Sequence, residues 1–292
     1  IMTKKIKVGI VGIVGRPNAG KSTFLNALIG ENVSLVASSP QATRRSIKGI
    51  YQDDDSQIIF IDLPGYHKTE SVISRALMKE FESWLRNVDM VLHFIDPSRP
   101  SGEEQSSLQE RLNFLSSKTV LTVYTKSDLR SIQAIPAWDT IFRISSNNQT
   151  TFSPLLSSIK DRLTLWEPLY DEDYYTDQDI FIRASEIIRQ QVIENLQEEL
   201  PHAVAVDVTQ FDVDEDGKAQ SIFAYIVVES DSQKGIILGK QASRLVEVRE
   251  KARLILNSVF DRHTRLFLRV KVVKNWRKNE QFINEVVFGN RK

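Results

Sequence analysis

A glycine-rich stretch near the start of the chain reads Gly15-Arg16-Pro17-Asn18-Ala19-Gly20-Lys21-Ser22. It fits the pattern G-x-x-x-x-G-K-[ST], directly after an apolar run at residues 6–14 and before a helical pattern at residues 21–28. In that setting, glycines let backbone N–H groups close around phosphate oxygens, and the helix N-terminus adds a positive partial charge. The stretch therefore predicts a phosphate-binding loop in which Lys21 reaches the β and γ phosphates and Ser22 ligates Mg²⁺.

The first half of the chain alternates short apolar runs with helical patterns. Strands are expected at residues 6–14, 57–62, 90–96, 120–125 and 141–145, and helices at residues 21–28, 72–85, 103–115 and 154–163. Continuous runs of β-branched and aromatic residues are typical of strands covered on both faces. The pattern predicts a mostly parallel α/β sheet with helices on each side, and ligands in such sheets bind beyond the carboxyl ends of the strands.

The character of the sequence changes after Trp166. Residues 167–179 are acidic and without periodicity, which is typical of a linker between domains. Beyond them we expect a helix from Ile180, strands at residues 203–211 and 221–229, a helix at residues 243–260 and a strand at residues 266–273, with a short extra helix before Gly239 left open. The predicted domains are residues 1–166, a linker at 167–179, and a smaller α+β domain at 180–292.

Composition narrows the classes of protein. The 292 residues are about twice the usual domain length, so two domains are expected. The absence of cysteine excludes disulfide frameworks, cysteine metal sites and thiol nucleophiles, and it favours a cytoplasmic location. The longest apolar stretches, such as residues 58–63, are far shorter than the roughly 20 residues that cross a bilayer.

The net charge is zero, but the charges are unevenly spread. Residues 167–220 hold fifteen acidic and three basic side chains, a net of −12, and residues 233–292 hold fifteen basic and five acidic ones, a net of +10. This asymmetry fits an anionic partner for the C-terminal region. It fits equally well a fold in which the two regions neutralise each other.

A second motif, Asp62-Leu63-Pro64-Gly65, ends an apolar strand of the same domain. A carboxylate there can hold Mg²⁺ through water, and a glycine N–H can approach the γ-phosphate. Any strand can end in Asp and Gly, so the motif gains its meaning from its place after the phosphate loop. Thr43, in the polar stretch between the two motifs, could add a hydroxyl to Mg²⁺ when a triphosphate is bound.

A third motif, Thr125-Lys126-Ser127-Asp128, and a later strand end, Ile144-Ser145-Ser146, bear on the choice of base. A carboxylate can accept two hydrogen bonds from guanine N1 and N2, which adenine cannot offer, while a lysine stem covers the base plane. The backbone at Ser145 and Ser146 could meet guanine O6. The order and spacing of the motifs predict a guanine-nucleotide site and argue against an ATP-dependent phosphoryl transferase.

In these motifs the chain resembles the Era family of bacterial ribosome-assembly GTPases, and the resemblance extends over nearly its whole length. Besides the phosphate loop, the resemblance rests on the following segments, several of which are specific to this family rather than to GTPases at large: Gln41-Ala42-Thr43-Arg44, Asp62-Leu63-Pro64-Gly65-Tyr66-His67-Lys68, Tyr175-Thr176-Asp177-Gln178, Ser185-Glu186-Ile187-Ile188-Arg189, Ser232-Gln233-Lys234-Gly235-Ile236-Ile237-Leu238-Gly239-Lys240 and Val273-Lys274-Asn275-Trp276-Arg277. The resemblance implies a phosphate-loop GTPase domain followed by a type II KH domain. It implies GTP hydrolysis coupled to binding of the 3′ end of small-subunit ribosomal RNA, with the 30S subunit as partner.

The expected site residues follow from the motifs and the resemblance together. GTP or GDP would be held by Gly15, Arg16, Pro17, Asn18, Ala19, Gly20, Lys21, Ser22, Thr23, Asp62, Leu63, Pro64, Gly65, Tyr66, Thr125, Lys126, Ser127, Asp128, Ser145 and Ser146. Mg²⁺ would be held by Ser22, Thr43 and Asp62, and catalysis assigned to Lys21, Asn18, Thr43 and Gly65. Asn18 matches a position that binds K⁺ in related GTPases, so a potassium ion is a further expected cofactor. RNA contacts are expected at Lys234, Gly239, Lys240, Gln241, Arg244, Arg269 and Lys271.

The sequence departs from the family pattern at three places, and from Ras-like enzymes at a fourth. Thr125 stands where the guanine motif N-K-x-D has Asn, so weaker affinity with retained specificity is expected. Ala42 replaces the first of two usual threonines, and Tyr66 takes the place at which Ras-like enzymes carry a water-orienting Gln. Ala242 replaces the last glycine of the G-x-x-G loop with which KH domains clamp the RNA backbone, and we expect it in helical geometry with RNA binding retained.

One alternative of another class stays open. The second domain could dock protein or membrane surface, which would make the chain a nucleotide-dependent adaptor rather than an RNA-binding switch. The basic residues of the last strand, Arg265, Arg269, Lys271, Lys274 and Arg277, could then serve only to pair with acidic ones. A peripheral association with the inner face of the membrane and a monomeric state are also expected.

Overall fold

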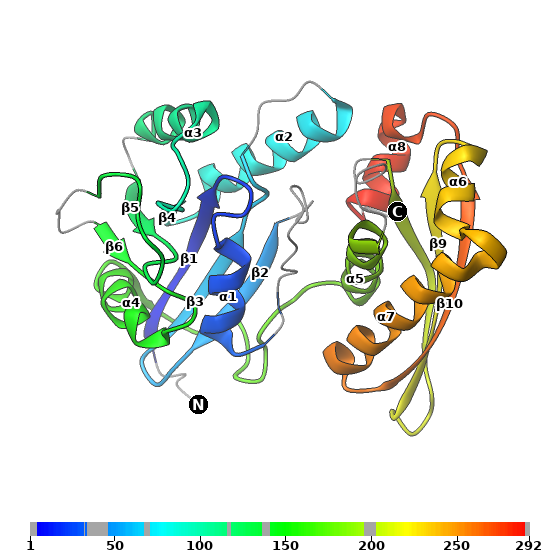
Figure 1. Cartoon of the computed structure of the whole chain (residues 1–292). Helices are drawn as coiled ribbons and strands as arrows, with labels where there is room; N and C mark the ends of the chain where they lie inside the picture. The colour runs from blue at the N-terminus through cyan, green and yellow to red at the C-terminus, as the bar shows by residue number, and fades with distance from the viewer. Residues whose placement is uncertain are drawn as a thin grey trace. The chain divides into compact units, whose positions relative to one another are not determined.

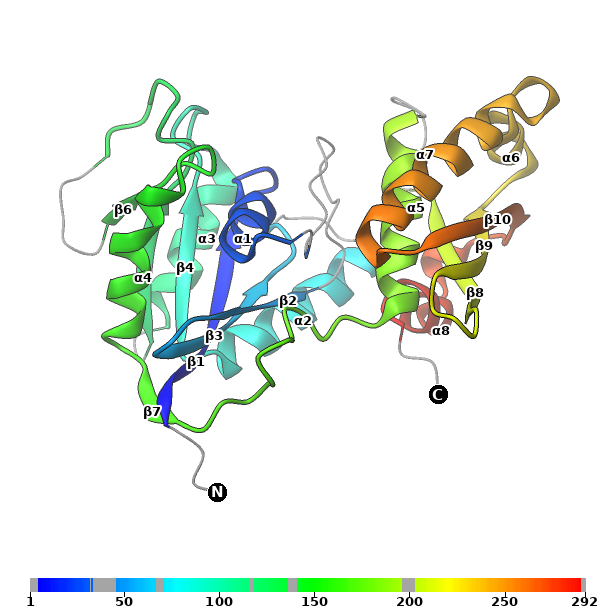
Figure 2. The same ribbon diagram turned by 90° about the horizontal axis from the view of Figure 1, so that it is seen from below.

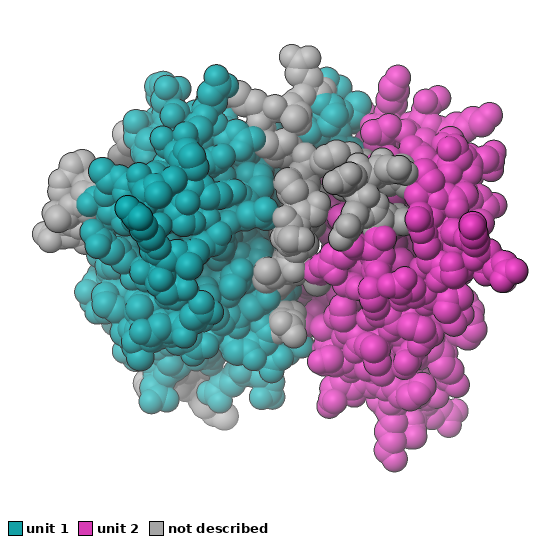
Figure 3. Space-filling model, in the orientation of Figure 1, with its two compact units in different colours: residues 1–177 teal, residues 178–292 magenta. Residues whose placement is uncertain are grey.

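A computed structural model describes residues 5–31, 33, 46–66, 71–115, 118–135, 141–195 and 203–289. The chain forms two compact units, residues 1–177 and 178–292, which Figure 3 shows in different colours. Thr43, with the segment Gln41-Ala42-Thr43-Arg44, and His67 lie outside the described residues. In the part of the chain that is described, no helix is both long and apolar enough to cross a membrane.

Unit 1 is built on a single sheet with the strand order β2-β3-β1-β4-β5-β6 (Figure 1), and β7 pairs with β1 (Figure 2). The strands are β1 Ile6–Gly15, β2 Ile47–Gln52, β3 Ser56–Asp62, β4 Met90–Ile95, β5 Thr119–Tyr124, β6 Ile141–Arg143 and β7 Thr164–Trp166. The helices are α1 Lys21–Ile29, α2 Val72–Asn87, α3 Glu103–Asn113 and α4 Ser153–Lys160. Strands β3, β1, β4, β5 and β6 run parallel, whereas β2 and β7 run antiparallel to their neighbours. The predicted mostly parallel α/β sheet is confirmed.

Helices cover both faces of this sheet (Figures 1 and 2). On one face Phe24 of α1 makes edge contacts with Phe60, Phe94 and Phe152, within a buried cluster that includes residues of α4. On the other face, Phe81 of α2 and Leu108 of α3 are buried with residues of β1, β3 and β4. Each fully buried side chain of this size contributes about 1.5–3 kcal/mol, so the central strands are rigid supports for the loops at their carboxyl ends.

The acidic segment after Trp166 lies largely within unit 1, because a buried glutamine ties it to the sheet. Gln57 of β3 donates to the Tyr170 carbonyl at 2.8 Å and accepts from the backbone N–H groups of Leu169 and Tyr170 at 2.7 and 3.0 Å. Thr176 donates its hydroxyl to the Lys48 carbonyl at 2.8 Å. The units accordingly divide at residue 177, near the far end of the expected linker.

Unit 2 is a three-stranded sheet with helices packed on one face. Its elements are α5 Ile180–Asn195, β8 Ala205–Val213, β9 Ala219–Val228, α6 Asp231–Leu238, α7 Ser243–Phe260 and β10 His263–Val272, followed by short helical turns at Trp276–Lys278, Glu280–Phe282 and Ile283–Val287. The strand order is β10-β9-β8, with β9 parallel to β10 and antiparallel to β8. Phe211 of β8 contacts Phe181 of α5 and Phe260 of α7. The short helix α6 before Gly239 completes the α-β-β-α-α-β order of a type II KH domain.

Candidate functional site

The phosphate loop joins β1 to α1 in the conformation that an anion site needs. Asn18 and Gly20 have positive φ angles of 61° and 87°, and Gly20 caps the helix, its carbonyl accepting from Phe24 N–H at 2.9 Å. A Cβ added to Gly15 would lie 2.6 Å from the Phe94 carbonyl oxygen, so no larger residue fits there. The loop therefore leads closely into the start of α1, where the helix dipole favours negative charge.

Lys21 is held inside this loop. Its side chain is buried and its ammonium group lies 3.5 Å from the Gly15 carbonyl oxygen and 3.3 Å from that of Arg16. Burial lowers the pKa of Lys21 below its ordinary value, an effect that nearby Asp62 opposes. A cation removed from water in this way is stabilised by phosphate oxygens when they arrive, which is the role predicted for Lys21.

Ser22 and Asp62 bring two oxygen ligands together at the start of α1. The Ser22 hydroxyl donates to Asp62 Oδ2 at 2.6 Å, and Asp62 is fully buried at the end of β3. A hydroxyl and a carboxylate are hard oxygen donors, and Mg²⁺ in nucleotide sites takes one or two such protein ligands together with phosphate oxygens and water. The chemistry of the pair therefore fits Mg²⁺, and coordination by Ser22 and Asp62 stays a prediction.

The Asp62-Leu63-Pro64-Gly65 segment runs along the phosphate loop. Tyr66 N–H donates to the Gly15 carbonyl at 3.2 Å, and a Cβ on Gly65 would lie 2.9–3.1 Å from atoms of Pro17. Only glycine allows this approach without displacement of Pro17. The centre of the Tyr66 ring lies 5.7 Å from that of Phe81, and Tyr66 packs against the buried cluster that contains Phe81.

Thr125 connects the predicted guanine motif to the phosphate loop. Its hydroxyl lies 2.8 Å from the Ala19 carbonyl oxygen and 3.3 Å from that of Ile95, and its side chain is buried. The hydroxyl at this position thus braces the loop. Weaker guanine affinity caused by Thr125 stays a prediction. Removal of the hydroxyl that contacts Ala19 would test what Thr125 contributes.

Asp128 lies at the surface with its carboxylate already oriented by two donors. Ser145 donates to Oδ1 at 2.6 Å and Asn147 donates to Oδ2 at 3.1 Å. The Ser145 hydrogen bond lowers the pKa of Asp128. A carboxylate that stays ionised is the acceptor that guanine N1–H and N2–H require. The backbone next to Asp128 is held in place because Ser127 N–H donates to the Ile144 carbonyl at 3.0 Å.

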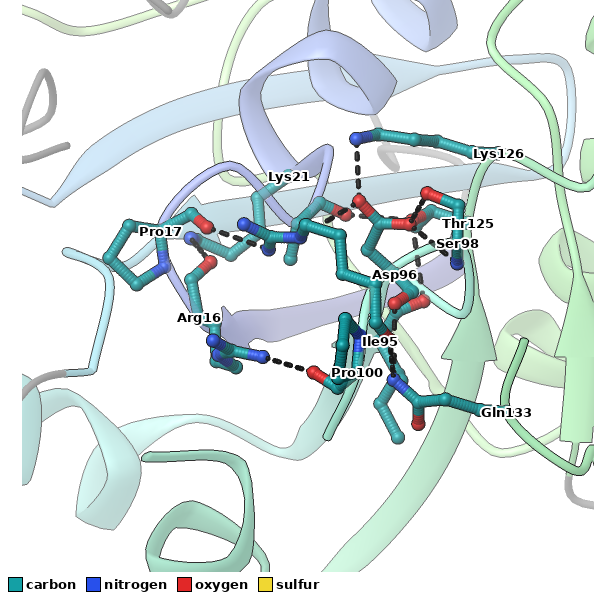
Figure 4. A network of polar contacts seen from close by, with 12 residues as sticks. Arg16, Pro17, Lys21, Ile95, Asp96, Ser98, Pro100, Thr125, Lys126 and Gln133 are labelled. Carbon is teal, nitrogen blue, oxygen red and sulfur yellow. Dashed lines mark hydrogen bonds and ion pairs between the residues drawn. The ribbon is translucent and has the colours of Figure 1, made fainter. Parts of the chain in front are cut away.

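Three residues of this region were not predicted from the sequence. Asn147 orients Asp128, and the loop after β4 places Asp96 and Arg99 against Lys126 and the phosphate loop (Figure 4). Asp96 stands at the end of an expected strand, but a single Asp or Arg after a strand has no motif to mark it. Ser146 directly follows Ser145, which donates to Asp128, and Thr23 directly follows Ser22, which donates to Asp62.

The predicted RNA loop lies between α6 and α7 and has an unusual backbone. Gly239, Gln241 and Ala242 all have positive φ angles, of 69°, 50° and 60°. The expectation of helical geometry at Ala242 is therefore wrong, because this residue caps α7 from the left-handed region. Lys240 and Gln241 are exposed, whereas Arg244 donates to the Ile236 carbonyl at 3.3 Å and covers Gly239.

The basic residues of β10 are in two different states. Arg265 Nη2 donates to both carboxylate oxygens of Asp214, at 2.7 and 2.9 Å, and Arg277, further along the chain, pairs with Glu229. Arg269 and Lys271 are exposed, and the Lys271 ammonium lies 5.8 Å from the centre of the Tyr225 ring. Lys234 lies on α6, beside the loop.

The fold and these motif positions define a phosphate-loop GTPase unit followed by a KH unit. A family described as 50S ribosome-binding GTPase matches residues 10–126, and the KH domain family matches residues 199–277. GTPase Era of Treponema denticola is 39% identical over 96% of this chain and 99% of its own, and GTPase Era of Borreliella burgdorferi is 37% identical over 97% and 100%. The chain belongs to the GTPase Era family, and it is a GTPase.

Two solved Era structures resemble the chain over 96% of its length and 98% of theirs, each with a TM-score of 0.86 and 29% identity. One is Era in complex with MgGDPNP and nucleotides 1506–1542 of 16S ribosomal RNA. The other is a tyrosine-to-alanine variant of Aquifex aeolicus Era bound to GDP·AlF4⁻. Both the nucleotide unit and the KH unit of this chain therefore have counterparts in one protein.

Proposed function

We propose that this GTPase binds Mg²⁺ with GTP or GDP at the carboxyl ends of β1, β3, β5 and β6, and that its KH unit binds the 3′ end of small-subunit ribosomal RNA. The observation that carries the nucleotide half is that the phosphate loop, Asp62, the segment Thr125–Asp128 and Ser145 lie together although they are far apart in the sequence. They are joined by hydrogen bonds from Ser22 to Asp62, from Thr125 to Ala19 and from Ser145 to Asp128, and Lys21 is held within the loop. The Era–MgGDPNP–RNA complex supports both halves. The chain would act as a switch in small-subunit assembly.

Within this site the chain's own residues have distinct tasks. Lys21 and the loop N–H groups would bind the phosphates, Ser22 and Asp62 would hold Mg²⁺ with the Thr43 hydroxyl, and Gly65 N–H would meet the γ-phosphate. Bound Mg²⁺ neutralises charge that develops on the phosphate oxygens. Asn18, at its positive φ angle, would help to hold K⁺; hydrolysis at equal rates in potassium and sodium buffers would contradict that assignment.

The base half of the proposal is tested by Asp128→Asn. An amide at this position can donate to the 2-carbonyl of xanthine but not pair with the 2-amino group of guanine, so affinity should fall for GDP and rise for XDP. Asp161→Asn, an exposed change elsewhere in unit 1, is the matched control. Unchanged GDP affinity in the Asp128 variant would contradict the guanine site.

The RNA half is tested with the full chain and a short RNA that matches the 3′ end of small-subunit ribosomal RNA. Binding is measured with a GTP analogue, with GDP and without nucleotide over a salt series, because phosphate contacts make affinity fall as salt rises. Binding that the GTP analogue strengthens supports the switch. No binding in any state, with GDP still bound, would contradict RNA binding by the KH unit.

A second candidate, a nucleotide-dependent adaptor, is favoured by the charges of unit 2. Residues 178–292 hold eighteen basic and seventeen acidic side chains, and Arg265 and Arg277 are neutralised within the unit. The same RNA titration decides between the candidates. A cytoplasmic location, a peripheral association with the membrane and a monomeric state stay predictions.

A further inference from the structure

The loop that follows β4 holds the phosphate loop at two adjacent residues (Figure 4). Arg99 donates from Nη2 to the Pro17 carbonyl at 3.0 Å. In the opposite direction, Arg16 donates from Nη1 to the Pro100 carbonyl at 3.0 Å. Backbone carbonyls on both sides are thus bound by guanidinium groups, which make stronger hydrogen bonds than neutral donors do.

Asp96 anchors this loop and joins it to the guanine motif. Its Oδ2 lies 2.6 Å from the Lys126 ammonium and 3.2 Å from Arg99 Nε, while its Oδ1 accepts from Ser98 N–H at 3.0 Å and from the Ser98 hydroxyl at 2.6 Å. The Asp96 side chain is only 1% exposed. Burial opposes its ionisation, but the hydrogen bonds from Lys126 and Ser98 outweigh burial and lower the pKa of Asp96. An ionised, buried carboxylate therefore binds two cations from two different loops.

The guanidinium shape of Arg99 makes the connection possible. Nη2 donates to the Pro17 carbonyl, while Nε lies 3.2 Å from Asp96 Oδ2 at ion-pair distance without the geometry of a hydrogen bond, so one rigid planar group lies between a buried anion and a phosphate-loop carbonyl. A lysine has a single ammonium on a flexible stem and cannot hold the same fork geometry. Pro17 is also the residue against which Gly65 packs, so a shift of Pro17 would disturb both loops that face the phosphates.

We propose that Arg99, anchored by Asp96, is a positioning residue that fixes the phosphate loop at Pro17 and couples it to Lys126, the lysine of the guanine motif. The proposal rests on the nucleotide site proposed above. Arg99 acts through the loop rather than by touching the base. Asp96 is the shared anchor, so loss of either cation loosens the hold on the other half of the site.

The first test compares GDP affinity of the full chain with Arg99→Ala and Arg99→Lys. Both should bind GDP about tenfold more weakly, since each loses a charge-assisted hydrogen bond that holds the loop. The matched control is Arg111→Ala, which breaks the Arg111–Glu82 ion pair of the same unit at 2.5 Å. That control should keep wild-type affinity, and thermal unfolding of each variant shows that it is folded.

Two results of this comparison would overturn the proposal. Wild-type affinity in Arg99→Ala would show that the loop needs no such bridge. Wild-type affinity in Arg99→Lys would show that positive charge suffices and that the fork is not what matters. Failure of the proposed guanine site would look different, because Asp128→Asn would then bind GDP as tightly as the wild type does. The Arg99 variants do not test recognition of the base, so the two failures can be told apart.

The second test is a double-mutant cycle between Arg99→Ala and Lys126→Ala. If Asp96 couples the two, the double variant should lose several-fold less affinity than the product of the single losses, because either change alone already loosens the network. A purely structural role of Arg99 would give independent effects. Losses that multiply within twofold would therefore overturn the coupling.

Discussion

Among single residues, Ala242 occupies a backbone conformation that suits glycine better. It has φ 60° and ψ 20° at the start of α7. The left-handed region costs a residue with a Cβ roughly 1–2 kcal/mol, a cost that glycine avoids. Glycine also makes the unfolded chain more flexible, which lowers the free energy of unfolding by about 0.4–1 kcal/mol. Ala242→Gly should therefore raise the free energy of unfolding by about 0.5–1 kcal/mol in urea denaturation.

The neighbouring residue provides the control for this prediction. Ser243 has right-handed helical angles, φ −60° and ψ −40°, so Ser243→Gly should lower stability instead. Equal effects from the two substitutions would contradict the left-handed assignment. RNA affinity of Ala242→Gly should be retained, since the loop geometry is the same with either residue.

His93 makes the stability of unit 1 depend on pH. It is buried in β4, and burial lowers its pKa from 6.5 to about 4. Between these two values the unfolded chain binds a proton that the folded chain does not, so the free energy of unfolding falls as pH drops from 6.5 to 4, by up to about 3 kcal/mol, and no further below.

His93→Gln should flatten this part of the pH profile, as measured by urea unfolding of the nucleotide-free protein between pH 7 and pH 4. The other titrating groups are the same in both proteins, so the difference between the two profiles isolates His93. Parallel profiles would mean that the imidazole titrates alike in the folded and unfolded chain.

Single residues also show what the sequence could not reveal about the site. Lys21, Ser22, Asp62 and Asp128 could be picked out from the sequence, because three motifs follow one another along the chain in a set order. The partners of Thr125 and Lys126 could not, since they depend on which loops the parallel strands bring together. Asp96 and Arg99 stand outside every motif, and only the three-dimensional proximity of the loop after β4 marks them.

At the scale of elements, the contact between the end of β5 and the phosphate loop is a single hydroxyl. Thr125→Val keeps the shape of the side chain but leaves the Ala19 carbonyl without this donor, at a cost of about 1–2 kcal/mol. GDP affinity should fall about tenfold in equilibrium titration, with the preference for guanine unchanged because Asp128 is untouched. Thr125→Ser, which keeps the hydroxyl, should bind almost as wild type; equal losses in both variants would rule out the hydroxyl as the cause.

Elements differed in how well the sequence predicted them. The buried parallel strands and the helices between them were found because each is a long apolar or periodic run. The antiparallel strands were missed, both β2 at the edge of the sheet and β7, which pairs with the start of β1. Strand β7 has only three residues, and β2 contains Gly49, where an added Cβ would lie 2.6 Å from Ile29 of α1. Close packing of α1 therefore demands a residue that weakens the strand signal.

At the scale of the whole molecule, the charge asymmetry along the chain is resolved mostly inside unit 2. The acidic stretch includes β8 and the β8–β9 turn, and the basic stretch includes α7 and β10, so opposite charges meet within one fold, as at Arg265 and Asp214. Mutual neutralisation is thus confirmed for some residues. Arg269, Lys271 and Lys240 remain exposed, and they are the ones expected to give RNA binding its dependence on salt.

The two compact units make the proposed switch a question of thermodynamic linkage. If a GTP analogue raises RNA affinity by some factor relative to GDP, RNA must raise the preference for the analogue over GDP by the same factor, because both describe one coupling free energy. We expect a factor of about 5–150, the usual range for such coupling. It is measured by RNA titration at saturating nucleotide and by nucleotide titration at saturating RNA. A factor of one in both directions would mean that the GTPase and KH units bind independently, and the nucleotide would then regulate something other than RNA affinity.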